Sequence, residues 1–121
     1  MRAYRFLANA HLSAHAYRQA LDTVEPGLAI APDDAALVAL RGEANAGLGN
    51  TEAALADWRR ALELDPEDIG PLYSSAFLLE REGRPEEAAE AWRSIIGWNE
   101  ARGYTLQTVW PRQELDRLTS G

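Results

Sequence analysis

The stretch ALVALRGEANAGLGNTEAALADWRRALELDP, residues 36–66, decides the fold. Its apolar residues recur at steps of three and four on both sides of Gly49–Asn50, which is the spacing of one helical face. Glycine adopts the left-handed backbone that ends a helix, and asparagine is a good N-cap for the next one. Asp65–Pro66 should end that second helix, because the residue before a proline is disfavoured in α geometry. The stretch therefore predicts two helices joined by a tight turn.

This pattern returns along the chain with a period of 34 residues. The equivalent residues are Ala20, Ala54 and Ala88; Leu28, Leu62 and Ile96; Pro32 and Pro66; Gly49 and Gly83; Trp58 and Trp92; and Arg59 and Arg93. A fixed period of roughly 20 to 50 residues is typical of stacked repeats, each of which buries its apolar face against its neighbours. The sequence thus predicts three helix pairs, at residues 1–34, 35–68 and 69–102.

The last repeat and the C-terminal segment depart from the pattern. Glu100 stands where a proline would be expected, so the last helix of the third repeat should run to about Arg102 and end at Gly103. Within residues 103–121, Pro111 suits the first turn of one more helix. This helix would cap the end of the stack. Trp110 should pack there, with Trp98 as its candidate neighbour.

Each repeat also places small and large residues at fixed positions. Residues 35–68 supply Gly42, Ala54, Trp58, Ala61 and Pro66; residues 69–102 supply Ala76, Gly83, Ala88 and Trp92; residues 1–34 supply Tyr4, Leu7, Ala8, Ala20 and Pro32. This arrangement resembles the tetratricopeptide repeat family, in which small residues let two helices approach closely. The resemblance implies an all-α fold, a tandem helix-hairpin solenoid of seven helices in a short right-handed superhelical arc, as a single domain over residues 1–121. It also implies a non-enzymatic adaptor or scaffold that binds other proteins.

In proteins of this family the first helices of successive repeats line a concave groove that holds a partner segment. Carried over residue by residue, the groove positions are Arg2, Arg5, Asn9 and Leu12; Ala36, Ala39, Glu43 and Ala46; and Tyr73, Phe77, Glu80 and Arg81. Tyr73 and Phe77 would anchor the partner and the two N-terminal arginines would orient it, because aromatic and arginine side chains dominate interface hot spots. The alternative is that Tyr73 and Phe77 pack against the C-terminal segment or within the core.

The first helix offers a second candidate surface. Parts of Tyr4, Leu7 and His11 would lie on its outer side, with no preceding helix to cover them. This face would suit a homodimer, which would make the chain a self-associating structural subunit. The plainer explanation is that these side chains are partly exposed. A third possibility is an accessory subunit for an enzyme on another chain.

Composition disfavours several kinds of partner. The net charge is −7 over 121 residues, with no block of like charge, and such an acidic surface repels the phosphates of nucleic acids. No apolar run approaches the roughly 18 residues of a membrane span, and the charged N-terminus does not resemble a secretion signal. We therefore expect a cytoplasmic chain whose partner is a protein or peptide, not nucleic acid or membrane.

The sequence offers no catalytic or metal-binding motif. It has no cysteine, no phosphate-binding loop, no nucleophile elbow and no HExxH segment. His11 and His15 have the spacing of two metal ligands on a helix, but no third ligand lies nearby on that helix. We therefore expect no metal, no cofactor and no enzymatic activity.

Overall fold

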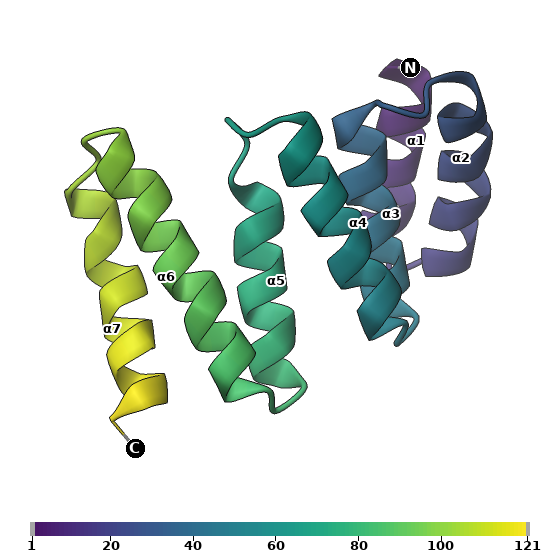
Figure 1. The fold of residues 1–121 in the computed structure, drawn as a ribbon. Helices are drawn as coiled ribbons and strands as arrows, with labels where there is room; N and C mark the ends of the chain where they lie inside the picture. Colours follow the sequence, from purple (N-terminus) through teal and green to yellow (C-terminus); the bar gives the residue numbers. More distant parts are fainter. Residues whose placement is uncertain (1, 121) are drawn as a thin grey trace. The chain divides into compact units, whose positions relative to one another are not determined.

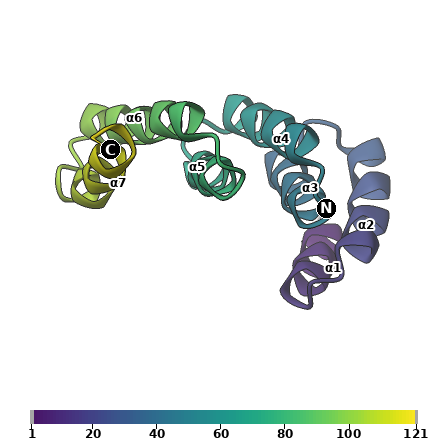
Figure 2. The same cartoon turned by 90° about the horizontal axis from the view of Figure 1, so that it is seen from below.

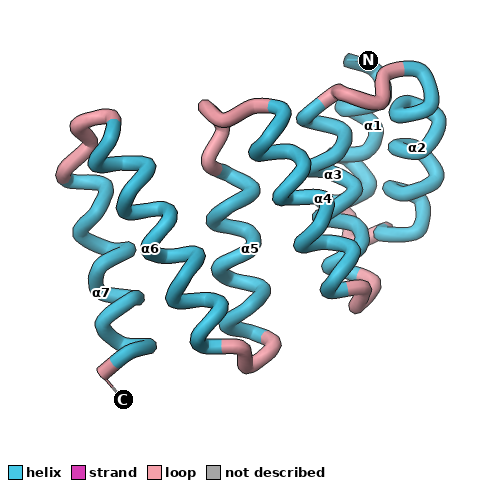
Figure 3. Tube along the Cα trace, in the orientation of Figure 1, coloured by secondary structure: helices cyan, strands magenta, loops and turns pink. Residues whose placement is uncertain are grey.

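The computed structural model describes residues 2–120, and within this range the chain is helical without any strand (Figures 1 and 3). The helices are α1 (Arg2–Ser13), α2 (Tyr17–Ile30), α3 (Ala35–Gly47), α4 (Thr51–Leu64), α5 (Gly70–Arg81), α6 (Pro85–Ala101) and α7 (Val109–Thr119), with the 3₁₀ turn η1 (Leu106–Thr108) before α7. The predicted all-α class and the seven helices are confirmed over the described residues. None of these helices is both long enough and apolar enough to cross a membrane.

Glycines end three of the helices, as the sequence predicts. Gly49, Gly83 and Gly103 have φ angles of +83°, +72° and +73°, in the left-handed region that glycine adopts without strain. Asn50 occupies the N-cap position of α4, but its side chain makes no capping hydrogen bond and instead donates to Oδ1 of Asn45 at 3.3 Å. The glycine therefore does more than the asparagine to define this turn.

The chain forms two compact units, Met1–Pro71 and Leu72–Gly121. Unit 1 contains α1 to α4, which are the first two predicted repeats. Unit 2 contains most of α5 together with α6, η1 and α7, which are the third repeat and the C-terminal segment. The border between the units lies close to the predicted border between the second and third repeats, at residues 68 and 69.

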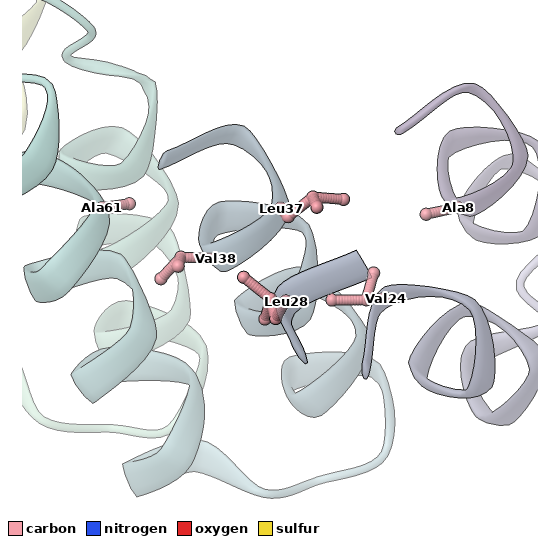
Figure 4. Packing of buried hydrophobic residues seen from close by; sticks show 6 residues of the cluster. All are labelled: Ala8, Val24, Leu28, Leu37, Val38 and Ala61. Carbon is pink, nitrogen blue, oxygen red and sulfur yellow. The ribbon is translucent and has the colours of Figure 1, made fainter. Parts of the chain in front are cut away.

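The core of unit 1 lies between its two helix pairs, as Figure 4 shows. Its buried members are Ala8, Val24, Leu28, Leu37, Val38 and Ala61, and Tyr4, Ala39, Leu40 and Leu64 pack against them. Gly42 of α3 lies against Trp58 of α4, and a Cβ at Gly42 would stand only 2.6 Å from Nε1 of Trp58. That indole nitrogen donates a hydrogen bond to the Ala39 carbonyl at 3.2 Å. The glycine is therefore required by the close approach of the two helices.

A partly buried charge pair joins α3 to α4. Arg41 donates from Nη2 and Nε to Oδ1 of Asp57 at 2.9 and 3.1 Å, and Asn45 donates to the other carboxylate oxygen at 3.2 Å. The hydrogen bond to Asp57 raises the pKa of the Arg41 guanidinium, against the opposing effect of burial. The three side chains thus satisfy one another's hydrogen-bonding groups inside the hairpin.

Unit 2 is organised around Trp92 of α6, which is fully buried. Figure 2 shows α5 and α7 on the same side of α6, and Trp92 meets both of them. Its ring makes edge-on contacts with Tyr73 and Phe77 of α5 and with Trp110 of α7, at centroid distances of 5.9, 5.5 and 5.2 Å. Its Nε1 donates to Glu80 at 2.7 Å. One tryptophan thereby connects three helices.

The expected pairing of Trp110 with Trp98 is wrong. Trp110 lies against α5 and Trp92, whereas Trp98 lies against Tyr104, at a centroid distance of 6.0 Å, and beneath the Arg102 guanidinium at 3.8 Å. Trp98 and Trp110 lie on either side of the turn at residues 102–108. Because α7 runs back along α6 after this turn, the two side chains contact different neighbours. The predicted course of α6 and α7 is confirmed, with α6 ending at Ala101 and Pro111 buried in the first turns of α7.

Candidate protein-binding surfaces

Tyr73, Phe77 and Trp110 form a partly exposed surface on α5 and α7 of unit 2, called here the aromatic surface. The Tyr73 and Trp110 rings are nearly parallel, at 7° and a centroid distance of 6.2 Å. The Phe77 ring lies 6.5 Å from the first and 5.6 Å from the second. Phe77 is 48% exposed and Trp110 is 45% exposed, although each also contacts the buried Trp92.

These contacts hold the three rings in place. The buried Trp92 supports each of them edge-on, so their side-chain rotations are already restricted. Ordering a side chain during binding costs about 0.5–1.5 kcal/mol, and a surface that is already ordered avoids most of that cost. The sequence left open whether Tyr73 and Phe77 pack against the C-terminal segment or face a partner. Both side chains do contact Trp110 of that segment, and Phe77 nevertheless remains about half exposed.

The structure gives Glu80 and Arg81 different environments. Glu80 accepts hydrogen bonds from Trp92 and from Arg117 of α7, and only 19% of its side chain is exposed. Hydrogen bonds to Glu114 and Glu80 raise the pKa of the Arg117 guanidinium. Arg81 is exposed, with its nearest described carboxylate, that of Glu82, at 3.8 Å. Glu80 therefore links α5, α6 and α7, while Arg81 faces solvent one helical turn after Phe77.

Unit 1 carries the other predicted groove residues on α1 and α3, which contact each other. Arg2, Arg5 and Asn9 are exposed on α1, Leu12 is half-buried, and Glu43 is exposed on α3. The Nε atom of Arg5 lies 3.8 Å from a carboxylate oxygen of Asp34. Unit 1 thus presents a polar surface with two arginines at the start of α1.

The outer face predicted for α1 differs in part from the one observed. Tyr4 packs against the core of unit 1, where a Cβ on Gly27 would lie 3.1 Å from its ring. His11 is half-buried and Leu7 is about half exposed. The most exposed large hydrophobic side chain of α1 is Phe6, at 76%, which was not singled out from the sequence. The exposure of Phe6 could have been predicted from the sequence. Residues two apart point to roughly opposite sides of a helix, and Tyr4 and Ala8, on either side of Phe6, are core residues.

Among residues 2–120, no three histidine, cysteine or acidic side chains come close enough together to hold a metal ion. His15 instead has its Nδ1 3.3 Å from the hydroxyl of Tyr17, at the turn between α1 and α2. The side chains gathered at the described surfaces are aromatic, arginine and amide groups, which are suited to recognition of another protein.

Antiparallel helix pairs that recur every 34 residues and pack through small residues define a helical-repeat protein of the interaction type. A family model described as tetratricopeptide repeat matches residues 7–69, just over half of the chain. The chain belongs to the tetratricopeptide repeat family, whose members are typically non-enzymatic protein-interaction modules.

The chain is similar to solved structures of MamA. MamA from Desulfovibrio magneticus RS-1, residue 41 to the end, matches with a TM-score of 0.76 and 27% identity over 83% of this chain and 56% of that one. A double mutant of MamA RS-1 matches with a TM-score of 0.74 and 27% identity, over 84% and 57% of the two chains. The chain thus spans a little over half the length of these two proteins. MamA MSR-1, at 16% identity, shares the fold, with a TM-score of 0.62 over 97% and 75% of the two chains. No match was found among curated protein sequences.

Proposed function

We propose that this chain is an adaptor or scaffold module that binds a segment of another protein on its aromatic surface. The observation that carries the proposal is that Phe77 and Trp110 are each nearly half exposed while the fully buried Trp92 fixes their rings. Rigid aromatic side chains with exposed faces are favoured anchors at protein interfaces. Membership of a family of interaction modules supports the same class of function.

Polar groups near the rings would orient the bound segment. Arg81 follows Phe77 by one helical turn and is exposed, so it can contact a carboxylate or a carbonyl of the partner. Separately, on unit 1, Arg2, Arg5, Asn9 and Glu43 are proposed to contribute polar contacts to a partner protein and Leu12 an apolar contact, as expected for first-helix residues of this family. Glu80 is proposed to act indirectly, because its carboxylate holds Trp92 and α7 in position.

Selection from a displayed peptide library tests this proposal and needs no identified partner. Peptides enriched on the wild-type chain should bind a Phe77→Gln variant about tenfold or more weakly, because loss of a hot-spot aromatic costs at least about 1.4 kcal/mol. Glutamine preserves the helical propensity of the position. Affinity is measured by fluorescence anisotropy, and circular dichroism checks that the variant is folded.

Leu106→Gln is the matched control, since Leu106 is 83% exposed in unit 2 and lies outside the aromatic surface. The same peptides should bind this variant within about twofold of the wild type. Failure to enrich any peptide, or equal binding to the wild type and to Phe77→Gln, would contradict the assignment of the aromatic surface.

A further inference from the structure

The start of α1 combines an exposed aromatic ring with two cations, and is called here the N-terminal knob. Phe6 is 76% exposed, and Arg2 lies one helical turn before it. Arg5 is adjacent in sequence, and α1 contains no acidic residue. Arg2 and Arg5 also stand near the positive end of the helix dipole, where cations are disfavoured. Contact with carboxylates from another molecule would relieve this repulsion.

Unit 2 has a hollow of complementary character between the first turns of α6 and the end of α7, called here the α6–α7 hollow. Pro85, Ala89 and Leu118 form its apolar part, Glu86 and Glu90 supply two carboxylates, and Arg93 supplies one cation. Neither glutamate forms an ion pair with any residue in the range 2–120. The hollow measures about 380 Å³, with room for an inserted side chain.

We propose that the N-terminal knob of one copy of this chain binds the α6–α7 hollow of a second copy. Phe6 would enter the apolar part of the hollow, and the two arginines of α1 would meet the two glutamates of α6. The charge complementarity favours this occupant, because α1 carries only positive charge while the chain as a whole has a net charge of −7. Aromatic and arginine residues are also the side chains most often dominant at interfaces.

This contact joins two different surfaces, so it does not close on itself as a symmetric dimer would. A bound pair leaves one knob and one hollow unoccupied, and a heterologous contact of this kind adds further copies head to tail. Because the interface is small, we expect a dissociation constant of about 10–100 µM and a strong dependence on salt. This self-assembly does not involve the aromatic surface, although it uses Arg2 and Arg5, which are also proposed to contact a partner protein.

Sedimentation velocity of the full chain over a range of concentrations tests the proposal. The wild type should form species whose mass grows with concentration and falls at high salt. Phe6→Ser should remain monomeric although it retains every charge. Leu106→Ser, which removes a comparably exposed apolar side chain elsewhere, should assemble like the wild type. Circular dichroism confirms that each variant is folded.

Charge reversal adds a rescue experiment. An Arg2→Glu, Arg5→Glu variant and a Glu86→Arg, Glu90→Arg variant should each remain monomeric, because like charges then face each other in either homotypic contact. An equimolar mixture should regain head-to-tail assembly with the two variants alternating, since the reversed knob fits the reversed hollow and the unchanged knob fits the unchanged hollow. A wild type that stays monomeric, assembly that survives Phe6→Ser or charge reversal, or a mixture that stays monomeric would overturn the proposal.

Discussion

Replacing Gly42 with valine is expected to lower the free energy of unfolding of unit 1 by about 3 kcal/mol, because the new side chain overpacks the contact with α4. A Cβ at this position would lie 2.6 Å from Nε1 and 2.8 Å from Cδ1 of Trp58, which is itself 3% exposed. The indole ring would have to move, and its hydrogen bond to the Ala39 carbonyl would be lost. Denaturant unfolding followed by circular dichroism, with amide hydrogen exchange read over α3 and α4, measures the effect.

Gly97→Ala supplies the control for this prediction. Gly97 lies inside α6, and a Cβ there would meet nothing within 4 Å. Alanine should therefore raise the free energy of unfolding by about 0.5–1 kcal/mol, through its better helical propensity. If Gly42→Val were as stable as the wild type, the close packing of α3 on α4 would be wrong.

Replacing Trp92 with alanine is expected to lower the free energy of unfolding of unit 2 by about 3–5 kcal/mol, the usual cost of a large cavity in a core. The change removes the ring that supports Tyr73, Phe77 and Trp110, and it leaves Glu80 without the indole donor. Hydrogen exchange over α5, α6 and α7 should accelerate together, since all three helices meet at this side chain.

The same substitution at Trp98 is the matched comparison. Trp98 is only half-buried and lies against Tyr104 and Arg102, near the end of α6. Its loss should therefore cost at most about half as much, because less surface is buried. Equal losses at the two positions would mean that Trp92 does not organise unit 2 as described.

The helices and their ends were predictable from the sequence because they depend on local chemistry. Periodic apolar residues set the buried faces, and glycines at positions 49, 83 and 103 set three of the ends. Repetition at 34 residues added independent evidence for each boundary. The N-cap of α3 could also have been predicted by the same local rule, although it was not. Asp34 directly precedes the helix and accepts a hydrogen bond from the Leu37 amide at 3.0 Å.

The candidate site was less predictable because it depends on contacts between helices that are distant in sequence. The family resemblance assigned Glu80 to a binding face, but it could not predict that the Trp92 indole and the Arg117 guanidinium would bind the Glu80 carboxylate. Similarly, spacing could not decide which aromatic residues Trp110 would meet. The course of the turn between α6 and α7 fixes that choice, and it brings Trp110 to Tyr73 and Phe77.

Site-specific photo-crosslinking in the cells that make this protein tests the partner-binding claim most directly. The photoreactive amino acid benzoylphenylalanine would replace Phe77 in one variant and Ala56, an exposed residue of α4, in another. We expect a discrete covalent adduct with a segment of another protein from position 77 and not from position 56, identified by mass spectrometry. Equal labelling from both positions, or adducts from position 77 only with copies of the chain itself, would contradict it.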